Sequence, residues 1–455
     1  MLVIISDLHL TDGTTGTTIG SGAFEDFQDR LKELAFDASW REDGRYEPVE
    51  ALDLVLLGDV LDVVRSTRWS EAKTGARDLV RPWHDWNDPR FAAKIDEITS
   101  AILERNKESL AFLKAFSEGR AITVPADPQS PLGERVGVDV RIHYLAGNHD
   151  WYYHIPAPAF DAIREKIGAA IGLCHGSGPY VHDPMESAAL IEIYRRHRLF
   201  ARHGDIYDPF NYVEQEGRDV ATLGDAMVVD LINRFPHEVR QRMGHLPAPF
   251  LDGLDELANV RPSVLVPVWV DGLLKSAELG REQTDRIKAI WDGLVDEFLE
   301  VPFVRKQDKP FWPDLVDGLQ ATLHLSKRLP FDDIARLVTL ISKKGGTEGF
   351  SYARRALKEE AFESGMADHI VYGHTHHYEV VPLDQRQSGG RTINRMCFNS
   401  GTWHAIHERT LHSMVDYRFA SFHVMTYLAF FAGDERKGRA FETWSGTLGV
   451  ADSTA

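Results

Sequence analysis

Cysteine is scarce in this sequence, and its scarcity limits how the fold can be stabilised. Among 455 residues there are two cysteines, Cys174 and Cys397. Two thiols cannot form the dense disulfide framework that supports small secreted domains. We therefore expect the stability to come from a buried apolar core, and we expect a reducing, cytoplasmic location.

Basic residues and long apolar runs are also scarce. The chain has 51 Lys and Arg against 69 Asp and Glu, and its formal net charge is −18. Because binding to a nucleic-acid backbone requires surplus positive charge, we expect nucleic acid to be an unlikely partner. The richest apolar stretch, residues 422–432, includes His423 and is shorter than the ~18 apolar residues of a membrane span. The first seven residues have no basic leader and include Asp7, so we expect no signal peptide.

Several short apolar runs end at polar clusters. With 43% hydrophobic residues, the chain is apolar enough to bury a large core. Near-continuous apolar runs are typical of strands covered on both sheet faces, and four such runs occupy residues 2–6, 52–57, 141–146 and 369–372. Each run is followed by Asp, His or Asn side chains. Because ligands collect at the carboxyl ends of strands, we expect an α/β fold with a binding site there.

Helical patterns separate these strands. Apolar residues recur at helical spacing in residues 91–113, 287–298 and 334–341. Residues 211–365 contain the last two patterns and almost none of the strand ends, so we expect a mostly helical insertion there. Residues 65–135 are expected to form a second, smaller helical insertion.

The strand ends supply side chains suited to hard divalent cations. The candidate ligands are Asp7, His9, Asp59, Asn148, His203, His374 and His376. A two-metal site needs six or seven oxygen and imidazole ligands, with one carboxylate shared between the metals. The set contains no thiolate, which favours a catalytic over a structural metal site. Since alternate residues of a strand lie on the same side, Asp7 and His9 are expected to share one side of an extended segment, and His374 and His376 are expected to do the same.

Five sequence blocks, in this order, resemble the calcineurin-like metallophosphoesterase superfamily. They are Asp7-Leu8-His9, Gly58-Asp59-Val60-Leu61-Asp62, Gly147-Asn148-His149-Asp150, His203-Gly204-Asp205 and Gly373-His374-Thr375-His376. Residues 399–403 also resemble the segment that commonly follows the last block. The resemblance covers about residues 1–210 and 366–455, the two parts of one catalytic core. It implies a four-layer α/β/β/α sandwich in which residues 211–365 form a cap.

The resemblance also implies an activity and residue roles. The activity is hydrolysis of a phosphomonoester, phosphodiester or pyrophosphate bond by a hydroxide held between two divalent metal ions, which would be Mn, Fe or Zn. One metal would be held by Asp7, His9, Asp59 and His376, and the other by Asp59, Asn148, His203 and His374. His149 would protonate the leaving oxygen, and Asp150 would orient the His149 imidazole. The acidic balance favours a small phosphorylated substrate over a polyanion.

Alternatives remain open for the function and for one ligand. The fourth block resembles the UDP-2,3-diacylglucosamine hydrolase branch, but that branch typically has Arg at the position of His149 and a far shorter insertion. We therefore do not transfer its substrate to this chain. His175 is a rival to His203 as the lone histidine ligand. The alternative functions are a scaffold or binding protein that keeps the fold without activity, and a nuclease.

Other side chains near the motifs have structural explanations beside functional ones. Asp62 is expected to support the site rather than to bind metal. Four arginines are expected to form an ion-paired surface, with substrate contact as the alternative: Arg195, Arg196, Arg198 and Arg202. His404 and His407 are expected at the surface, with the rim of the site as the alternative. Six aromatic residues are expected to pack in the core rather than to line a pocket: Trp83, Trp86, Tyr152, Tyr153, Phe311 and Trp312.

Overall fold

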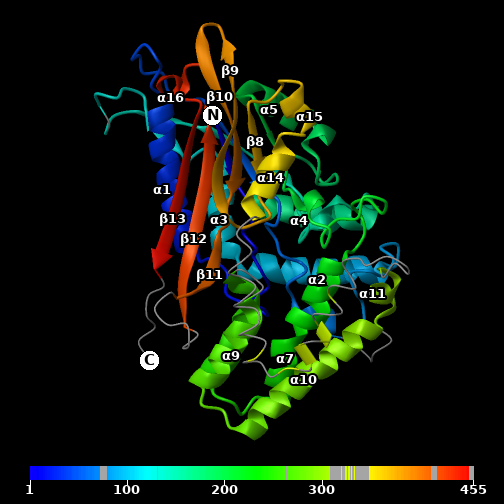
Figure 1. The fold of residues 1–455 in the computed structure, drawn as a ribbon. Coiled ribbons are helices and arrows are strands. Elements are labelled where there is room, and N and C mark those ends of the chain that lie inside the picture. Colours follow the sequence, from blue (N-terminus) through cyan, green and yellow to red (C-terminus); the bar gives the residue numbers. More distant parts are fainter. Residues whose placement is uncertain are drawn as a thin grey trace.

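The computed structural model of this chain has a mixed α/β fold with several sheets and helices (Figure 1). It describes residues 1–71, 79–130, 132–261, 265–307, 348–410 and 418–449, together with single positions between 319 and 333. The helical pattern expected in residues 334–341 and the aromatic pair Phe311 and Trp312 lie outside the described residues.

The larger sheet contains three of the four apolar runs as parallel strands. Its strand order is β5 (Asp139–Leu145), β2 (Ala51–Leu57), β1 (Leu2–Ile5), β12 (Phe419–Phe430), β11 (His404–Arg409) and β7 (Val260–Arg261), and β13 (Phe441–Gly449) also pairs with β12. Strands β1, β2 and β5 are mutually parallel neighbours, whereas β12 is antiparallel to β1. The carboxyl ends of β1, β2 and β5 therefore meet at the same end of the sheet.

The smaller sheet contains the fourth apolar run. Its strand order is β6 (Leu199–Ala201), β8 (His369–Tyr372), β10 (Arg391–Ser400) and β9 (Tyr378–Ser388), and the first three are parallel. One buried apolar cluster contains Ile4 and Val55 from the larger sheet and Val371 and Phe398 from the smaller sheet. The two sheets therefore share one core.

Helices pack against both sheets. Helices α1 (Ser21–Ala38), α2 (Pro89–Arg105), α3 (Lys107–Ser117) and α4 (Asp161–Ile171) place apolar side chains in the largest buried cluster, together with residues of β1, β2 and β5. Helices α14 (Glu348–Ala356) and α15 (Glu360–Glu363) pack with Phe200 and Tyr372 of the smaller sheet, and α5 (Ala188–His197) packs in the cluster that both sheets share. The expected helices between residues 65 and 135 are confirmed as α2 and α3, and they belong to the main core.

The helical insertion, residues 211–365, has a second apolar core of its own. It contains α6 (Leu223–Met227), a π-helical turn (Val228–Ile232), α7 (Arg234–Met243), α8 (Ala248–Asp255), α9 (Val266–Ser276), α10 (Arg281–Glu300) and α11 (Pro302–Gln307). Helices α7, α9 and α10 lie at the bottom of Figure 1, below both sheets. The insertion is tied to the rest of the chain, because β7 pairs with β11 and α14 packs on the smaller sheet.

The remaining elements are short. They are β3 (Thr123–Pro125), β4 (Arg135–Gly137), α16 (Glu435–Gly438) and the 3-10 helices η1 (Thr67–Ser70), η3 (Trp151–His154), η4 (Pro158–Phe160), η5 (Pro184–Glu186), η6 (Asp205–Tyr207) and η8 (Glu256–Asn259).

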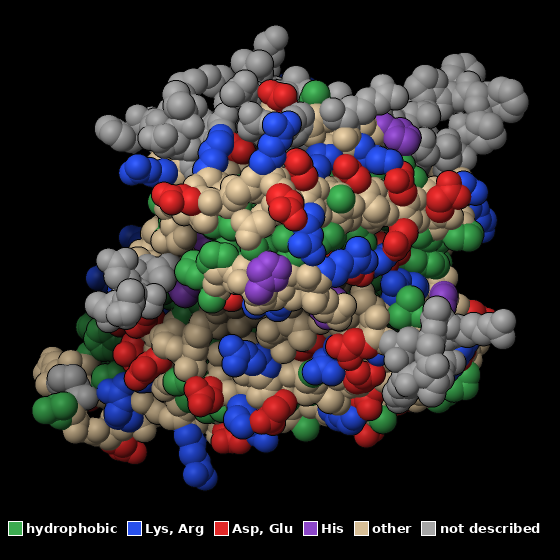
Figure 2. Space-filling model, turned by 90° about the horizontal axis from the view of Figure 1, so that it is seen from below, with side chains coloured by type: hydrophobic (Ala, Val, Ile, Leu, Met, Phe, Trp, Pro, Cys, Tyr) green, Lys and Arg blue, Asp and Glu red, His purple; other side chains and the backbone are tan. Residues whose placement is uncertain are grey.

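Among the described helices, none has the length and apolar character needed to cross a membrane. Viewed from below, Lys and Arg are interspersed with Asp and Glu over the coloured surface, so this face carries no field of one sign (Figure 2).

His197, the last residue of α5, predicts how the stability depends on pH. The residue is 5% exposed, and burial, aided by the Met1 amino group, lowers the pKa of its imidazole to about 3. An unfolded histidine titrates near pH ~6.5, so between these values the unfolded chain binds a proton that the folded chain does not. The folded protein should therefore lose stability as the pH falls from 6.5 towards 3, by up to about 1.4 kcal/mol per pH unit.

Removing this imidazole should remove that part of the pH dependence. The measured quantity is the free energy of unfolding of His197→Leu minus that of the wild type. We expect this difference to be about 2 kcal/mol more favourable to the variant at pH 5 than at pH 7. Denaturation midpoints of both proteins at the two pH values measure the difference. The exposed His245 provides a matched control as His245→Leu, which makes the same substitution outside the core. An equal difference at the two pH values for His197→Leu would contradict the prediction.

Candidate metal centre

Loops at the carboxyl ends of five strands bring all seven candidate ligands together. The loops after β1, β2, β5, β6 and β8 carry Asp7 and His9, Asp59, Asn148, His203, and His374 and His376, respectively. Their side chains form two adjoining groups, described below, in which every ligand atom lies near the others. These buried histidines and aspartates could hold metal ions.

The first group contains Asp7, His9, Asp59 and His376, and it offers four ligand atoms within 4.8 Å of one another. His376 Nε2 lies 2.9 Å from His9 Nε2 and 3.3 Å from Asp7 Oδ1. His9 Nε2 lies 3.7 Å from Asp59 Oδ2. Since metal–ligand bonds are ~2.0–2.2 Å long, donor atoms around one cation lie at separations like those just given. The donor types fit a hard or borderline metal.

The second group contains Asp59, His203 and His374, with Asn148 between the two histidines. His203 Nε2 lies 3.2 Å from Asp59 Oδ2 and 3.1 Å from Asn148 Oδ1. His374 Nδ1 lies 2.9 Å from the same Asn148 oxygen. The Asp59 carboxylate therefore belongs to both groups.

Hydrogen bonds on the far side of three of the imidazoles orient their rings. His9 Nδ1 lies 2.7 Å from Asp62 Oδ2, and His203 Nδ1 lies 2.9 Å from the Leu57 carbonyl oxygen. His374 Nε2 lies 3.0 Å from Asp208 Oδ2. Each acceptor takes the N–H of one ring nitrogen, so the other nitrogen presents its lone pair to the cluster, as in histidines that bind metals.

The backbone of the ligand loops is strained. Among the described residues, nine non-glycine residues have positive φ, and five of them are Asp7, His9, Asp59, His374 and His376, with φ between 44° and 67°. Such conformations cost about 1–3 kcal/mol each and concentrate at functional sites. The expectation that Asp7 and His9, and likewise His374 and His376, lie on extended segments is wrong, because β1 ends at Ile5, β8 ends at Tyr372, and all four residues have left-handed backbones.

Two glycines of the motifs are required by close approach of the ligand loops. A Cβ on Gly147 would lie 2.4 Å from Asp59 Oδ1, and a Cβ on Gly373 would lie 2.6 Å from Asp7 Oδ2. Both distances are below van der Waals contact, so any larger residue would displace a candidate ligand. The absence of a side chain at Gly147 and Gly373 is thus explained by close packing against the ligands, which the sequence spacing alone does not show.

Residues 399–403, which follow β10, support the first loop. Thr402 Oγ1 donates to the Asp7 carbonyl oxygen at 2.7 Å, and the Trp403 N–H donates to the same oxygen at 3.1 Å. Asn399 Nδ2 donates to the Gly373 carbonyl oxygen at 2.7 Å. This segment therefore holds the loops that carry Asp7 and His374 beside each other.

The partner of His149 differs from the expected one. His149 Nδ1 lies 2.8 Å from Asp62 Oδ1, and Asp62 also contacts His9 through its other oxygen. Asp150 instead accepts hydrogen bonds from the N–H groups of Gly147 and Val60 and from the Tyr144 hydroxyl. The expectation that Asp150 orients the His149 imidazole is therefore wrong. Asp150 joins the loop that carries Asn148 to the loop that carries Asp59, and Asp62 orients the imidazole.

The cluster has an electrostatic preference for positive charge. Burial favours protonation of Asp7 and Asp59, yet His203 and the other imidazoles hold the pKa of both carboxyls below its ordinary value. Burial also opposes the charged form of His149, but Asp62 and Asp59 raise its pKa to about 9. The three buried carboxylates Asp7, Asp59 and Asp62 therefore stabilise cations placed among them, whether protons or metal ions.

Other sequence candidates lie away from the cluster or have structural contacts. His175 contacts Tyr180 and its own loop, so His203 rather than His175 lies in the cluster. Three of the four arginines form ion pairs: Arg196 with Glu192, Arg198 with Asp368, and Arg202 with Asp183 and Glu359. Tyr152 and Tyr153 are buried in the main core, and Trp83 and Trp86 pack against it, as expected.

The expected surface positions of His404 and His407 are wrong. His404 is fully buried, lies 2.8 Å from Arg65 Nη1 through its Nε2, and stacks on the His9 ring at 5.5 Å. His407 is 7% exposed and bonds Ser421 and Glu256. The sequence also contained no signal for Asp208, which the fold brings to His374 from a loop outside the motifs.

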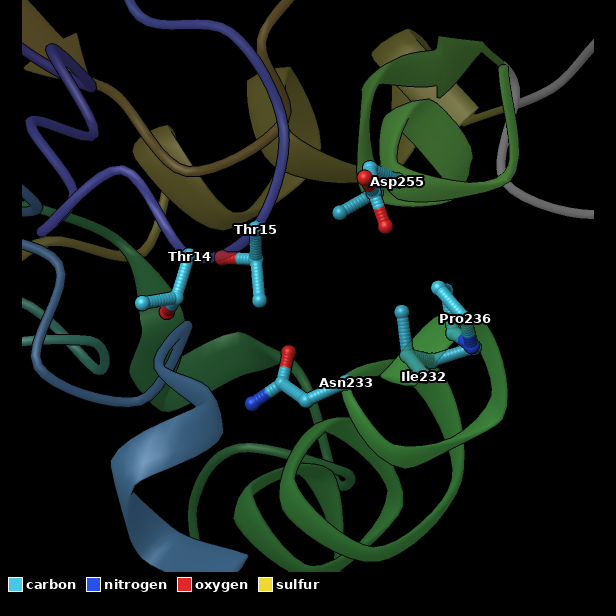
Figure 3. A pocket seen from close by; sticks show the side chains of 7 residues that line it. Thr14, Thr15, Ile232, Asn233, Pro236 and Asp255 are labelled. Carbon is cyan, nitrogen blue, oxygen red and sulfur yellow. The ribbon is translucent and has the colours of Figure 1, made fainter. Parts of the chain in front are cut away.

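A cavity lies where the loop after His9 meets the helical insertion (Figure 3). Thr14 and Thr15 line it from the loop, and Ile232, Asn233, Pro236 and Asp255 line it from the helices. A neighbouring cavity of about 260 Å³ shares Thr14 and Asp255 and extends to Arg105 and Glu256. The helical insertion thus adjoins the segment that leaves the candidate metal centre.

A scan against protein-family models and searches of curated proteins and of solved structures found no match to this chain.

Proposed function

We propose that this protein is a metal-dependent phosphoesterase with a dinuclear metal centre. The observation that carries the proposal is the position of Asp59, whose Oδ2 lies 3.7 Å from His9 Nε2 and 3.2 Å from His203 Nε2. One buried carboxylate is therefore common to two groups of potential ligands. A shared carboxylate suits two cations ~3.5–4 Å apart, the spacing used in two-metal phosphoryl chemistry. The five motif blocks support the same assignment.

The ligand assignment follows the two groups. Asp7, His9, Asp59 and His376 would hold one cation, and Asp59, Asn148, His203 and His374 would hold the other. The donors, which are carboxylate, amide and imidazole groups, suit Mn, Fe or Zn. Bound cations would supply Lewis acidity and neutralise charge on the phosphoryl oxygens.

The proton chemistry is assigned to His149. Its Nδ1 bonds Asp62, so its Nε2 is the atom that would give a proton to the leaving oxygen. The side chain is 18% exposed, whereas Asp62 is fully buried, so a substrate can reach the imidazole but not the carboxylate that orients it. Asp62 would stabilise the imidazolium before proton transfer.

The architecture supports the proposed family assignment. Two sheets share one apolar cluster, and helices pack on the other faces of both, which is the layering expected for a four-layer α/β/β/α metallophosphoesterase sandwich. The helical insertion contacts the loops that leave the ligand strands, because Asn233 Nδ2 donates to the Val64 carbonyl oxygen and Arg65 donates to Asn259. We assign it the role of a cap.

The substrate we propose is a small phosphorylated molecule. The chain carries 18 more acids than bases, and basic side chains do not gather on the face seen in Figure 2. Binding of a polyanion would require gathered basic side chains and is disfavoured by the net charge of −18, whereas a small phosphoryl group requires only local positive charge. We also infer a cytoplasmic location from the two cysteines.

The test is hydrolysis by metal-loaded protein. Purified protein dialysed against Mn²⁺ is expected to hydrolyse p-nitrophenyl phosphate or its bis-ester, and a chelator should abolish the activity. A pool of nucleotides and pyrophosphates, read by phosphate release, should then separate monoester, diester and pyrophosphate cleavage. If the metal-loaded protein turned over none of these, the scaffold alternative would replace the enzyme. Degradation of single-stranded DNA with steep salt dependence would favour the nuclease instead.

A further inference from the structure

Cys174 contacts a buried His–Asp pair that the proposed phosphoesterase does not use. The residue follows α4, and its backbone N–H donates to the Ile142 carbonyl oxygen of β5 at 3.0 Å. This bond holds the Cys174 loop along the outer edge of the larger sheet, where β5 is the edge strand. Cys174 is exposed, whereas the other cysteine, Cys397, is buried.

The three side chains form a continuous chain of hydrogen bonds. Cys174 Sγ lies 3.4 Å from His143 Nδ1, and His143 Nε2 lies 3.0 Å from Asp53 Oδ1. The side chains of His143 and Asp53 are 9% and 2% exposed. Arg141 Nη2 donates to the second Asp53 oxygen at 3.0 Å, which fixes the carboxylate.

The order of these bonds determines where the thiol proton can go. The Asp53 carboxylate only accepts, so His143 Nε2 carries a hydrogen and Nδ1 presents its lone pair to the thiol. Transfer of the thiol proton to Nδ1 gives a thiolate beside an imidazolium, which Asp53 stabilises. A nucleophile bonded to a base that a third group orients is the arrangement that activates catalytic cysteines. Although burial opposes a charged imidazole, Asp53 and Cys174 raise the pKa of His143 to about 9, so at pH 6 the ring is charged and both nitrogens donate, Nε2 to Asp53 and Nδ1 to the Cys174 sulfur.

We propose that Cys174, His143 and Asp53 form an activated-thiol site that reacts with small disulfides. In the reaction, the Cys174 thiolate attacks one sulfur of the disulfide, a new S–S bond forms to Cys174, and the old S–S bond breaks. The second sulfur leaves as a thiolate, which takes up a proton from His143 or from water. The product is a mixed disulfide on Cys174, and no other oxidant is needed.

A small disulfide suits this site better than an acyl substrate. Exchange requires only that the sulfur be accessible, and the exposed Cys174 meets that requirement. Acyl transfer would also require hydrogen-bond donors placed for an oxyanion in a cleft. The site is separate from the candidate metal centre, so the proposal does not depend on the phosphoesterase activity.

Several charged groups surround the imidazole and must be considered in any pH profile. Arg141 on β5 and the Met1 amino group both act on Asp53, and Asp53 in turn acts on His197 of α5, which also feels Arg196. His175, in the Cys174 loop, feels the charge of His143, and burial lowers the pKa of His175. At pH 6 the carboxylate and the guanidinium groups keep their charges, so a change of thiol reactivity there reports on His143 and Cys174.

The experiment measures the rate at which the protein reacts with an aromatic disulfide that releases a coloured thiolate. At pH 6, folded wild-type protein is expected to react about tenfold faster than the same protein unfolded in urea, because the thiolate is then a minor species of an ordinary cysteine. Intact-mass spectrometry and peptide mapping should place the adduct on Cys174. Folded Cys174→Ser should show no fast phase, because Cys397 is 4% exposed.

Two variants test the roles of the partners. His143→Gln and Asp53→Asn are expected to lower the pH 6 rate to that of the unfolded chain, whereas His175→Gln, which changes the histidine next to Cys174, should keep the wild-type rate. If the first two variants do not fold, the wild-type protein decides the question: the site predicts a faster reaction of the folded chain than of the unfolded chain at pH 6. A folded rate no higher than the unfolded rate would overturn the proposal, as would a wild-type rate in folded His143→Gln.

Discussion

Replacing Asp59 with Asn is expected to abolish nearly all phosphoesterase activity. The carboxylate lies in both ligand groups, so its loss weakens the binding of both proposed cations at once. Metal ions contribute several kcal/mol to stabilisation of a phosphoryl transition state, which corresponds to a loss in kcat of about 10³-fold or more. The measurements are turnover of p-nitrophenyl phosphate and metal content of the purified variant, and both should fall.

A second buried carboxylate provides the control for this variant. Asp368 is 2% exposed and pairs with Arg198 and Arg386 beside the smaller sheet, away from the ligand loops. Asp368→Asn removes the same charge and creates the same amide, so it should lower stability without lowering the metal content. If Asp59→Asn kept its metals and its turnover, the dinuclear assignment would be lost.

Replacing His149 with Ala is expected to give the second largest effect and a different signature. General acid catalysis contributes about 10²–10⁴-fold, so turnover of substrates with poor leaving groups should fall by this factor. Substrates with good leaving groups, such as p-nitrophenyl phosphate, need little protonation and should lose much less. Metal content should stay at the wild-type level, because His149 is not one of the seven proposed ligands.

Asp62 allows the His149 effect to be separated from a general loss of structure. The Asp62 carboxylate bonds both His149 and His9, so Asp62→Asn should lower turnover and also weaken metal binding. His175→Ala, a histidine outside the cluster, should change neither quantity. Equal losses across all leaving groups in His149→Ala would contradict its role as the proton donor.

The residue sequence carried much of the information about the strands and the cluster. Apolar runs at residues 52–57 and 369–372 indicated strands, and they form β2 and β8, because local periodicity reflects burial on both faces of a sheet. The polar residues after β1, β2 and β5 lie at one end of the larger sheet because these strands are parallel, and the packing of the smaller sheet adds those after β8. Periodicity likewise indicated the helices in residues 91–113 and 287–298, which the structure has as α2 with α3 and as α10.

Adjacency in the sequence was a poor guide to which side chains contact each other within the ligand loops. Asp150 follows His149 directly, yet the carboxylate that orients the imidazole is Asp62, 87 positions earlier. The expected extended geometry of Asp7 and His9 was wrong for a related reason: their positive φ values are imposed by contacts with other loops, not by local preference. His404 was expected at the surface, with the rim of the site as the alternative, but β11 stacks it on the His9 ring.

The sequence by itself thus indicated four of the strands, β1, β2, β5 and β8, and the ligand-type side chains that follow them, because both depend on neighbouring residues. Only the tertiary structure decided which atoms face one another. It made Asp59 common to two groups, gave Asp62 to both His9 and His149, brought Asp208 to His374 and set Cys174 against His143. The physical reason is that these contacts join segments far apart in the chain, and their geometry follows from sheet pairing and close packing rather than from spacing along the sequence.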